Sequence, residues 1–181
     1  MTSDSSFLND LWTLYFHDPS DMDWTTKSYK RLTNIASIEE FWEHHLCIIE
    51  KVHQGMFFIM REHIFPCWDD PHNIEGGCIS IKVLKENMKV FWEDIVIKLL
   101  GETLLQNDSA KHWDMLCGIS TSPKKHFCII KIWLKDATLA DKKHFDILPL
   151  YYGDIIYKVN RENITNDHDK QIEIHGSIAP E

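Results

Sequence analysis

One loop limits the possible folds of this chain more than any other segment, because it fits neither a helix nor a central strand. It runs from Phe65 to Asp70 with the sequence Phe-Pro-Cys-Trp-Asp-Asp, and Pro71 follows it directly. Proline has no N–H group and a fixed φ angle, so the two prolines exclude a helix interior and a central strand. The chain must therefore present Trp68 from a loop, although tryptophan is a side chain that proteins usually cover.

A second tryptophan, Trp24, lies in a comparable stretch of loop-type residues from Asp18 to Thr26. Two loop indoles with a neighbouring carboxylate, here Asp69, could stack a flat, electron-poor ring and accept hydrogen bonds from its donor edge. The alternative is that both indoles only cover the ends of a core beneath their loops, which is common for single aromatic residues. From these residues alone, the two interpretations have equal weight.

Size and charge restrict the domain organisation and the class of ligand. With 181 residues, of which 44% are hydrophobic and 12% aromatic, the chain suits one domain with a substantial core. We expect residues 1–6 to form a flexible tail and residues 7–181 to form a single domain. The net charge of −9 disfavours a long duplex as partner, because proteins that hold nucleic-acid backbones are normally basic. A nucleic-acid ligand would have to be short, with its phosphates bound by a local cluster of cations.

Cysteine usage and hydropathy indicate the compartment. The five cysteines include no CxxC pair and lie in apolar or strand-like settings, so we expect reduced, buried thiols. No signal peptide or membrane-spanning apolar run is present, and we expect a soluble cytoplasmic protein, with the nucleus as an alternative location. A metal site is a minor alternative, since its candidate ligands fit no familiar zinc spacing. These candidates are His63, Cys67, His72 and Cys78.

Hydrophobic periodicity predicts short strands that outnumber the helices. The expected strands are Leu11–Phe16, Arg31–Ile35, Met56–Met60, Cys78–Val83, Met115–Thr121, Phe127–Leu134, Tyr151–Val159 and Ile172–His175. A first helix should follow Ser37, which can form a capping box with Glu40, and further helices should span Asn87–Leu105 and Asp136–Leu148. We therefore predict an α+β fold in which about eight strands form one antiparallel sheet with three helices on one face.

A series of short segments also matches a known family in order and spacing. The segments are Leu11–Phe16, Trp24, Ile38–Trp42, Phe65–Asp70, Gly76–Gly77, Phe91–Trp92, Leu100–Glu102, Cys117–Gly118 and Ile130–Trp133. In this combination the chain resembles, from about Leu8 onward, the eukaryotic translation initiation factor 4E family, whose members hold the 7-methylguanosine cap of messenger RNA. The resemblance implies a curved sheet with the helices on its convex face and the ligand slot on its concave face.

The resemblance implies a role for each of four residues around the base. Trp24 and Trp68 would stack the methylated guanine, whose positive charge adds a cation–π attraction of about 1–2 kcal/mol per indole. Asp69 would accept the guanine N–H donors in place of the family's usual glutamate, with Asp70 as an alternative. Trp133 would lie against the methyl group. Neither a cofactor nor a metal is implied.

Phosphate binding is where the sequence departs most from the family pattern. Lys124 falls on a basic position of the family, but Ile129 and Cys78 stand at two other positions that are basic in relatives. Lys131 should share a strand face with Ile129 because side chains alternate along a strand, and it is a plausible substitute. Lys125 and His126, in the same turn as Lys124, could also contribute.

The resemblance further implies a partner surface on the convex side. A helical segment with the pattern Tyr-x-x-x-x-Leu-Φ, from a translation scaffold or a repressor, would dock there. The expected contact residues are Ile38, Trp42, Glu93, Asp94, Ile97 and Gly101. Glu93 replaces an apolar residue, usually leucine, so we expect a weakened partner or one that has co-adapted with a basic residue.

Three functions follow, and none of them is enzymatic because no catalytic motif is present. The favoured one is an initiation factor that binds the cap and recruits a scaffold, which the tryptophan at position 24 supports. A cap-binding repressor or decoy is the alternative that Glu93 supports. A protein–protein adaptor with a degenerate slot is supported only by Ile129 and Cys78. In each case we expect a monomer without membrane attachment.

Overall fold

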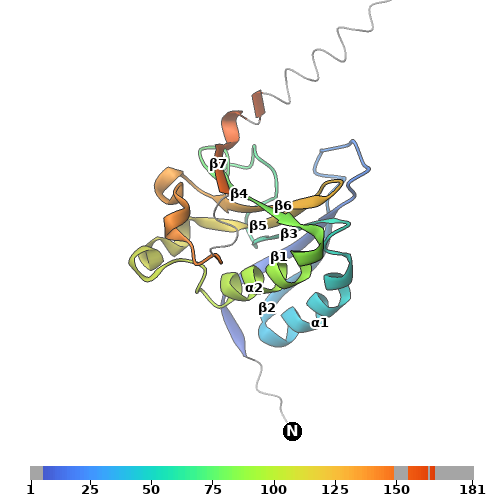
Figure 1. Cartoon of the computed structure of the whole chain (residues 1–181), viewed down its shortest axis with the longest axis horizontal. Coiled ribbons are helices and arrows are strands. Elements are labelled where there is room, and N and C mark those ends of the chain that lie inside the picture. Colours follow the sequence, from blue (N-terminus) through green and yellow to red (C-terminus); the bar gives the residue numbers. More distant parts are fainter. Residues whose placement is uncertain (1–5, 149–154, 163, 166–181) are drawn as a thin grey trace, which may run out of the picture.

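Strand pairing joins the chain into one curved antiparallel sheet with the order β2-β1-β3-β5-β6-β4-β7 (Figure 1). The computed structural model describes residues 6–148, 155–162 and 164–165. The elements in this part are β1 (Phe7–His17), β2 (Lys30–Ser37), α1 (Ile38–Ile48), η1 (Ile49–Lys51), β3 (Met56–Arg61), β4 (Gly77–Leu84), η2 (Lys85–Asn87), α2 (Met88–Leu100), η3 (Asn107–Met115), β5 (Leu116–Pro123), β6 (Phe127–Leu134), η4 (Ala137–Leu139), η5 (Lys142–His144) and β7 (Ile155–Val159). The predicted α+β fold is confirmed. Residues 151–154 of one expected strand, and the whole of the expected strand Ile172–His175, lie outside the described residues.

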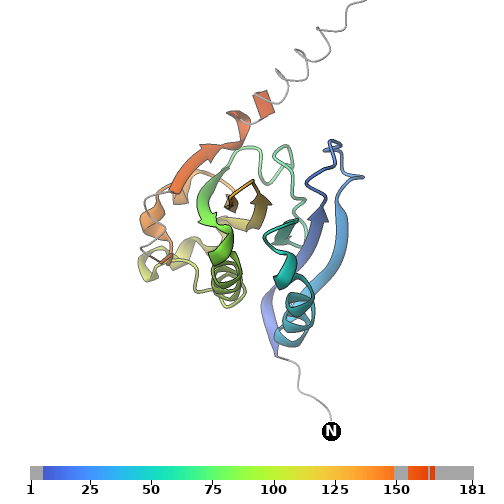
Figure 2. The same cartoon turned by 45° about the vertical axis from the view of Figure 1, so that its right-hand side comes forward.

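The alternation of side chains along the strands divides the apolar residues into two clusters. Leu14 in β1 and Ile132 in β6 pack with α1 and α2, whereas their neighbours Tyr15 and Trp133 belong to a smaller cluster on the other face. Figure 1 shows both helices on the same side of the sheet. The opposite face is therefore available to the loops that carry Trp24 and Trp68. Both loops lie away from the helices in Figure 2.

Helix α1 begins where the sequence predicts. The side-chain oxygen of Ser37 accepts a hydrogen bond from the backbone N–H of Glu40 at 3.2 Å. The other half of the expected capping box is not formed. The carboxylate of Glu40 accepts the backbone N–H of Ala36 at 2.7 Å instead of that of Ser37. Phe41 is 5% exposed and Trp42 is 38% exposed, so one of these adjacent rings enters the core and the other faces solvent.

Helix α2 ends at Leu100, five residues before the predicted end at Leu105. The backbone N–H of Thr103 donates to the carbonyl oxygen of Lys98 at 2.8 Å, which closes the helix as in a Schellman motif. This closure requires Glu102 to adopt a left-handed conformation with φ of 57°. Among the described residues, no helix is both long and apolar enough to cross a bilayer.

Substitution of Glu102 by glycine should stabilise the protein. Glycine adopts the left-handed conformation without the steric penalty of a Cβ atom, so we expect the free energy of unfolding to rise by about 1 kcal/mol. Thermal or urea unfolding of Glu102→Gly against the unmodified protein measures this change. Glu102→Ala is the matched control, since it removes the charge and keeps the Cβ; equal stability of the two variants would contradict the prediction.

The prediction of a regular third helix over Asp136–Leu148 is wrong. Asp136 caps η4 by accepting the N–H of Thr138 at 2.8 Å, and Asp141 caps η5 by accepting the N–H of Lys143 at 2.9 Å. Because Asp141 caps a new turn, the first turn does not continue, and the segment is divided into two short 3-10 helices. Directly after β7, residues 160–162 are helical.

Candidate functional site

Residues 62–76, the Trp68 loop, connect β3 to β4 and are held in shape from within by Asp70. Its carboxylate accepts hydrogen bonds from the backbone N–H groups of Phe65 at 3.1 Å and His72 at 2.8 Å. It also lies 3.0 Å from Nδ1 of His72. Because these bonds occupy Asp70 inside the loop, Asp69 is the carboxylate that remains to meet a ligand.

Asn73 is the second polar residue that organises the Trp68 loop, and no sequence pattern indicates this role. Its buried side-chain amide donates to the carbonyl oxygens of Phe65 at 3.0 Å and Cys67 at 2.8 Å. The backbone carbonyl oxygen of Asn73 accepts a hydrogen bond from the buried side-chain amide of Asn160 at 2.7 Å. The backbone N–H of Asn160 donates to Gly76 at 3.0 Å, so the residue after β7 is tied to the base of the loop.

Residues 18–29, the Trp24 loop, connect β1 to β2. Asp18 accepts hydrogen bonds from the hydroxyl of Ser20 at 2.7 Å and from its backbone N–H at 2.9 Å, and Asp23 accepts the backbone N–H of Thr25 at 2.8 Å. These hydrogen bonds lower the pKa of both carboxyl groups. The buried ring of His17 stacks on Trp24 with centroids 4.2 Å apart and planes 4° apart. His17 Nε2 lies 2.9 Å from the carbonyl oxygen of Asp23, which can only accept, so Nε2 is the donor. One face of Trp24 is therefore covered, although the residue as a whole remains 52% exposed.

Tyr29 connects the two loops. Its ring contacts His17 beneath Trp24 at a centroid distance of 4.9 Å and Phe65 of the Trp68 loop at 5.1 Å. It also contacts Phe58 of β3 at 5.5 Å. Neither His17 nor Tyr29 was predicted as a site residue. Their only signal in the sequence is that His17 directly precedes the Trp24 loop and Tyr29 ends it.

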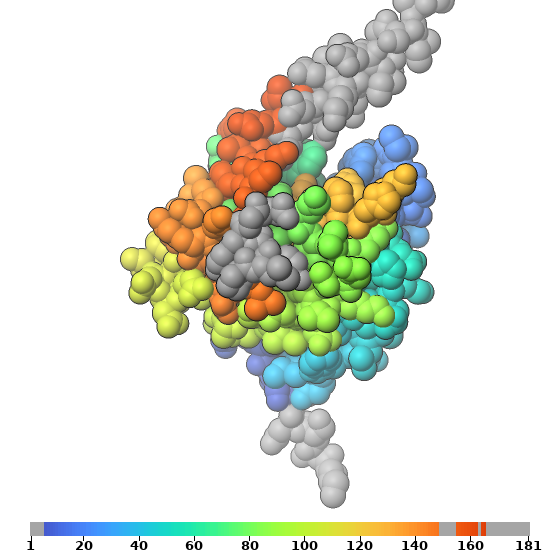
Figure 3. Space-filling model, in the orientation of Figure 1, coloured from blue at the N-terminus to red at the C-terminus, as the bar shows by residue number. Residues whose placement is uncertain are grey.

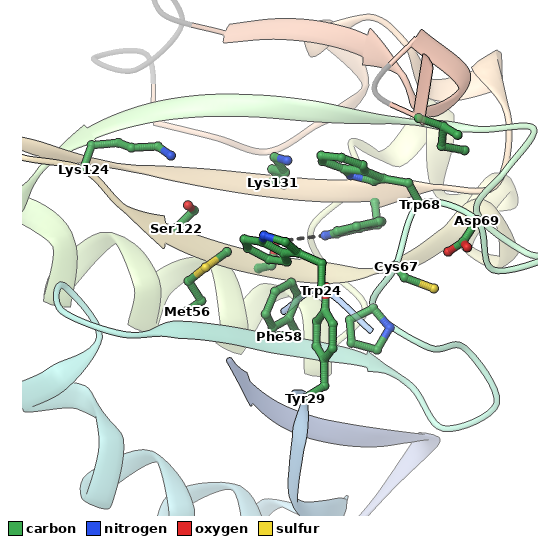
Figure 4. Close-up of a pocket in the computed structure, with 14 residues that line it drawn as sticks. Trp24, Tyr29, Met56, Phe58, Cys67, Trp68, Asp69, Ser122, Lys124 and Lys131 are labelled. Carbon is green, nitrogen blue, oxygen red and sulfur yellow. Dashed lines mark hydrogen bonds between the residues drawn. The ribbon is translucent and has the colours of Figure 1, made fainter. Parts of the chain in front are cut away.

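The two loops and the sheet enclose a cleft of about 520 Å³, which we name the slot (Figure 4). Of the residues predicted to bind the cap, those that line it are Trp24, Trp68, Asp69, Lys124, Lys131 and Trp133. Lys125 is exposed in the β5–β6 turn and is not among the lining residues. Trp133 forms part of the floor. It is 3% exposed, and its Nε1 donates to the hydroxyl of Ser120 at 2.9 Å.

The polar groups of the slot lie at two places. At the rim, burial and a hydrogen bond to Asp69 raise the pKa of the Cys67 thiol to about 12, so the thiol is protonated and donates to Asp69. On the floor, Nζ of Lys131 lies 4.9 Å from the centroid of the Trp68 ring and 6.0 Å from that of Trp133. The slot thus combines aromatic faces, one rim carboxylate and cations from β6 and the β5–β6 turn.

The described residues contain no group of three or more His, Cys, Asp or Glu side chains placed to hold a metal ion. His63 and His72 contact each other at a centroid distance of 5.0 Å, and the thiol of Cys78 points to Asn160 Oδ1 at 3.5 Å. All five cysteines are free thiols. The expectation that all are buried is wrong for Cys47, which is exposed on α1, and for Cys67, which is partly exposed at the slot.

On the opposite side of the sheet, α1 and α2 present an exposed apolar surface, which we name the dorsal patch. It consists of Ile38, Trp42, Leu46, Val90, Glu93 and Ile97. Figure 3 shows the surfaces of the two helices next to each other on one face. Leu46 and Val90 were not predicted as contact residues, although both are more exposed than Trp42. Gly101 is exposed at the end of α2, where its N–H caps the helix.

Both predicted carboxylates of the dorsal patch region have partners within the chain. Glu93 Oε2 lies 3.0 Å from Nε2 of His45, a residue of α1 that is itself buried. Asp94 forms an ion pair with Lys98 at 3.1 Å, and Lys98 also contacts Asp146 at 3.1 Å. Glu93 therefore joins α1 to α2 within the patch, while Asp94 shares the Lys98 cation with Asp146.

Comparison of the sequence with known proteins identifies one family. The family model of eukaryotic initiation factor 4E matches residues 7–173. The chain is 28% identical over 112 residues to the rice initiation factor NCBP, covering 60% of this chain and 47% of the relative. It is 26% identical over 170 residues to initiation factor 4E-3 of Arabidopsis thaliana, covering 87% and 68%. It thus spans about half the length of the first relatives.

Among solved structures, the chain is similar to C. elegans eIF4E-3 in its complex with the 4E-binding protein Mextli and a cap analog. The TM-score is 0.74 at 18% identity, with 89% of this chain and 96% of the other chain covered. A schistosome eIF4E, in complex with m7GpppA and 4E-BP, has a TM-score of 0.65 at 20% identity, with 76% and 75% covered. At these identities the likeness shows a shared fold.

Proposed function

Because this chain belongs to the eukaryotic initiation factor 4E family, we propose that it binds the 7-methylguanosine cap of messenger RNA. The observation that carries this proposal is that Trp24 and Trp68, from two separate loops, line the same slot above the buried Trp133. Stacking of a base on an indole contributes about 1–3 kcal/mol, and the positive charge of a methylated guanine adds a cation–π attraction. The structural relatives from C. elegans and schistosomes bind a cap analog and m7GpppA, respectively.

Recognition of the base edge falls to Asp69 in this proposal. Its carboxylate is exposed at the rim of the slot, whereas Asp70 is occupied within the Trp68 loop. The protonated Cys67 thiol donates one hydrogen bond to Asp69, and the remaining lone pairs of the two carboxylate oxygens could accept guanine N–H donors. Trp133 would contact the methyl group from the floor.

The phosphates of the cap would be met by lysines on the β5–β6 side of the slot. Lys124 and Lys131 line the slot, and Lys125 adjoins it in the turn. This local group suits the short ligand that a net charge of −9 permits. Residues 7–181 act as one cap-binding domain in the cytoplasm in this proposal.

A titration monitored by intrinsic tryptophan fluorescence tests the proposal. We expect 7-methyl-GTP to quench the fluorescence in a saturable way and to bind at least about 30-fold more tightly than GTP, which lacks the cationic ring. GTP at matched ionic strength is the control. Equal binding of both nucleotides, or binding of neither, would contradict cap recognition and favour an adaptor with a degenerate slot.

The dorsal patch supports a second part of the proposal, which is the docking of a helical Tyr-x-x-x-x-Leu-Φ segment of a translation scaffold on Trp42. Ile38 and Ile97 add exposed apolar surface to the patch, and Asp94 and Gly101 lie toward the end of α2. The relatives from C. elegans and schistosomes were solved with 4E-binding proteins. Such a partner would make the chain an initiation factor that promotes cap-dependent translation.

One observation favours a different outcome of cap binding, in which the chain is a repressor or decoy. The Glu93 side chain is 46% exposed within the dorsal patch and carries a charge that an apolar helix would have to cover. A chain that binds the cap without recruiting the usual scaffold would withhold the message from initiation. Measured affinity for the scaffold peptide separates the two outcomes.

A further inference from the structure

His17 forms a fixed support beneath one of the two slot indoles. It is the last residue of β1, it is fully buried, and its backbone pairs with Met56 of β3. Its imidazole lies parallel to the Trp24 indole, with centroids 4.2 Å apart and planes 4° apart. The ring of Tyr29 contacts the same imidazole at a centroid distance of 4.9 Å. The sheet and the loop together thus hold the imidazole in place.

Trp24 depends on this support more than Trp68 does. Trp68 packs against the smaller apolar cluster, whereas Trp24 is 52% exposed and belongs to neither cluster. Among the described residues, the ring contacts of Trp24 are the stack on His17 and an edge contact with Tyr29 at 6.4 Å. Its other face is left to the slot, into which both indoles point in Figure 4.

The surroundings of the imidazole favour its neutral form. Nε2 donates to the carbonyl oxygen of Asp23 at 2.9 Å. Nδ1 of His17 is buried and has no hydrogen-bond partner in the part of the chain that the structure describes. A proton added to Nδ1 would create a buried donor without an acceptor, which costs free energy. It would also place a positive charge directly beneath Trp24.

We propose that His17, as a neutral imidazole, is a positioning residue that holds Trp24 for stacking of the cap base, and that protonation of His17 weakens cap binding. This inference rests on the proposed function. A methylated guanine brings positive charge to the open face of Trp24. With His17 protonated, two cations would lie on opposite faces of one indole, where they share its π electrons and repel each other. Cap affinity should therefore fall as the pH drops through the range in which histidine takes up a proton.

The charged groups around His17 come from the Trp24 loop and the start of β2. The titratable residues there are Asp18, Asp23, Lys27, Tyr29 and Lys30. Both carboxylates interact electrostatically with His17, and each also has a lysine nearby. Burial raises the pKa of Tyr29, so its hydroxyl is neutral, and the cross-strand partner Met56 carries no charge. The two aspartates attract a proton to His17, whereas a cationic base on Trp24 opposes it.

Isothermal titration of 7-methyl-GTP into the full chain at about pH 8, where histidine is neutral, tests the support. We expect His17→Ala to bind about five- to tenfold more weakly, because the stacked ring is lost. His17→Gln should be equally weak, since it keeps a donor for Asp23 but has no ring. His17→Phe should recover most of the lost affinity. In a Trp24→Ala background, His17→Ala should cause no further loss, because His17 acts through that indole.

The pH profile tests the charge. Between about pH 8 and about pH 6, the affinity of the unmodified protein relative to that of His17→Phe should fall about threefold. Titration of the ligand and of all other groups is common to both proteins and cancels in this ratio. By linkage, 7-methyl-GTP should also release more protons from the unmodified protein than from His17→Phe, which titration in buffers of different ionisation enthalpy measures.

The outcomes separate this inference from the proposed function. If the unmodified protein does not bind 7-methyl-GTP, the proposed function fails and the role of His17 fails with it. If it binds, but His17→Ala costs less than about twofold, only the role of His17 is overturned. An equal loss in the Trp24→Ala background, or a pH-independent ratio to His17→Phe, overturns it as well. Unfolding temperatures of all variants verify the fold.

Discussion

Replacement of Trp68 by alanine should lower the affinity for 7-methyl-GTP by at least about 100-fold. The variant loses both the stacking of the base and the cation–π attraction on one face, which together amount to about 3 kcal/mol or more. The Nε1 atom of Trp68 is buried without a hydrogen-bond partner among the described residues, so packing positions the ring. The loop itself is held by Asp70 and Asn73 and should keep its shape without the indole.

Isothermal titration is the appropriate measurement, because the substitution also alters the fluorescence of the protein. Trp42→Ala is the matched control: it removes an exposed tryptophan from the dorsal patch on the other side of the sheet and should leave cap affinity unchanged. Trp24→Ala should resemble Trp68→Ala. If Trp68→Ala retains affinity within about threefold, stacking between the two indoles is wrong.

The second large effect concerns the dorsal patch. We expect Trp42→Ala to weaken a Tyr-x-x-x-x-Leu-Φ peptide by at least about 30-fold, as is typical of a central aromatic anchor in an interface. We expect Glu93→Leu to strengthen the same peptide about tenfold, because the apolar helix no longer has to desolvate a carboxylate. Fluorescence polarisation of a labelled peptide measures both changes.

Glu93→Gln is the control that separates charge from shape. It keeps an acceptor within reach of His45 Nε2, which lies 3.0 Å from the Glu93 carboxylate, and removes the charge. Glu93→Leu leaves the buried His45 without this partner, so its folding stability must be measured beside its affinity. If neither variant binds the peptide better than the unmodified protein, Glu93 is not the obstacle. Strong binding by the unmodified protein would instead favour the scaffold-recruiting function.

The strands were predictable because short runs of apolar, β-branched and aromatic residues between turn residues indicate strands, even where both faces of the sheet are covered. Leu14 and Tyr15 already differ in environment at adjacent positions, as do Ile132 and Trp133. The ends of the helices were less predictable. Helix α2 is closed by Glu102 in a left-handed conformation. A glutamate in the sequence does not predict that conformation, which is usually adopted by glycine.

The candidate site was predictable only in part. Trp24 and Trp68 stood out because loop-type residues surround them, whereas His17 reads as an ordinary polar residue at the end of a strand. Its stacking on Trp24 depends on how the following loop folds back. The approach of Lys131 to Trp68 likewise joins β6 to a distant loop. Alternation indicates the face on which a side chain lies, but it does not indicate which ring the side chain meets there.

The hydrogen bonds of Asn160 have a consequence for the synthesis of this protein. Its side chain and backbone bind Asn73 and Gly76, so the residue after β7 completes the base of a loop encoded some 85 positions earlier. A chain emerging from the ribosome would expose both indoles before that support exists, since domains are made from the N-terminus onward. The nascent protein would thus acquire a fully organised slot only after Asn160 has left the ribosome.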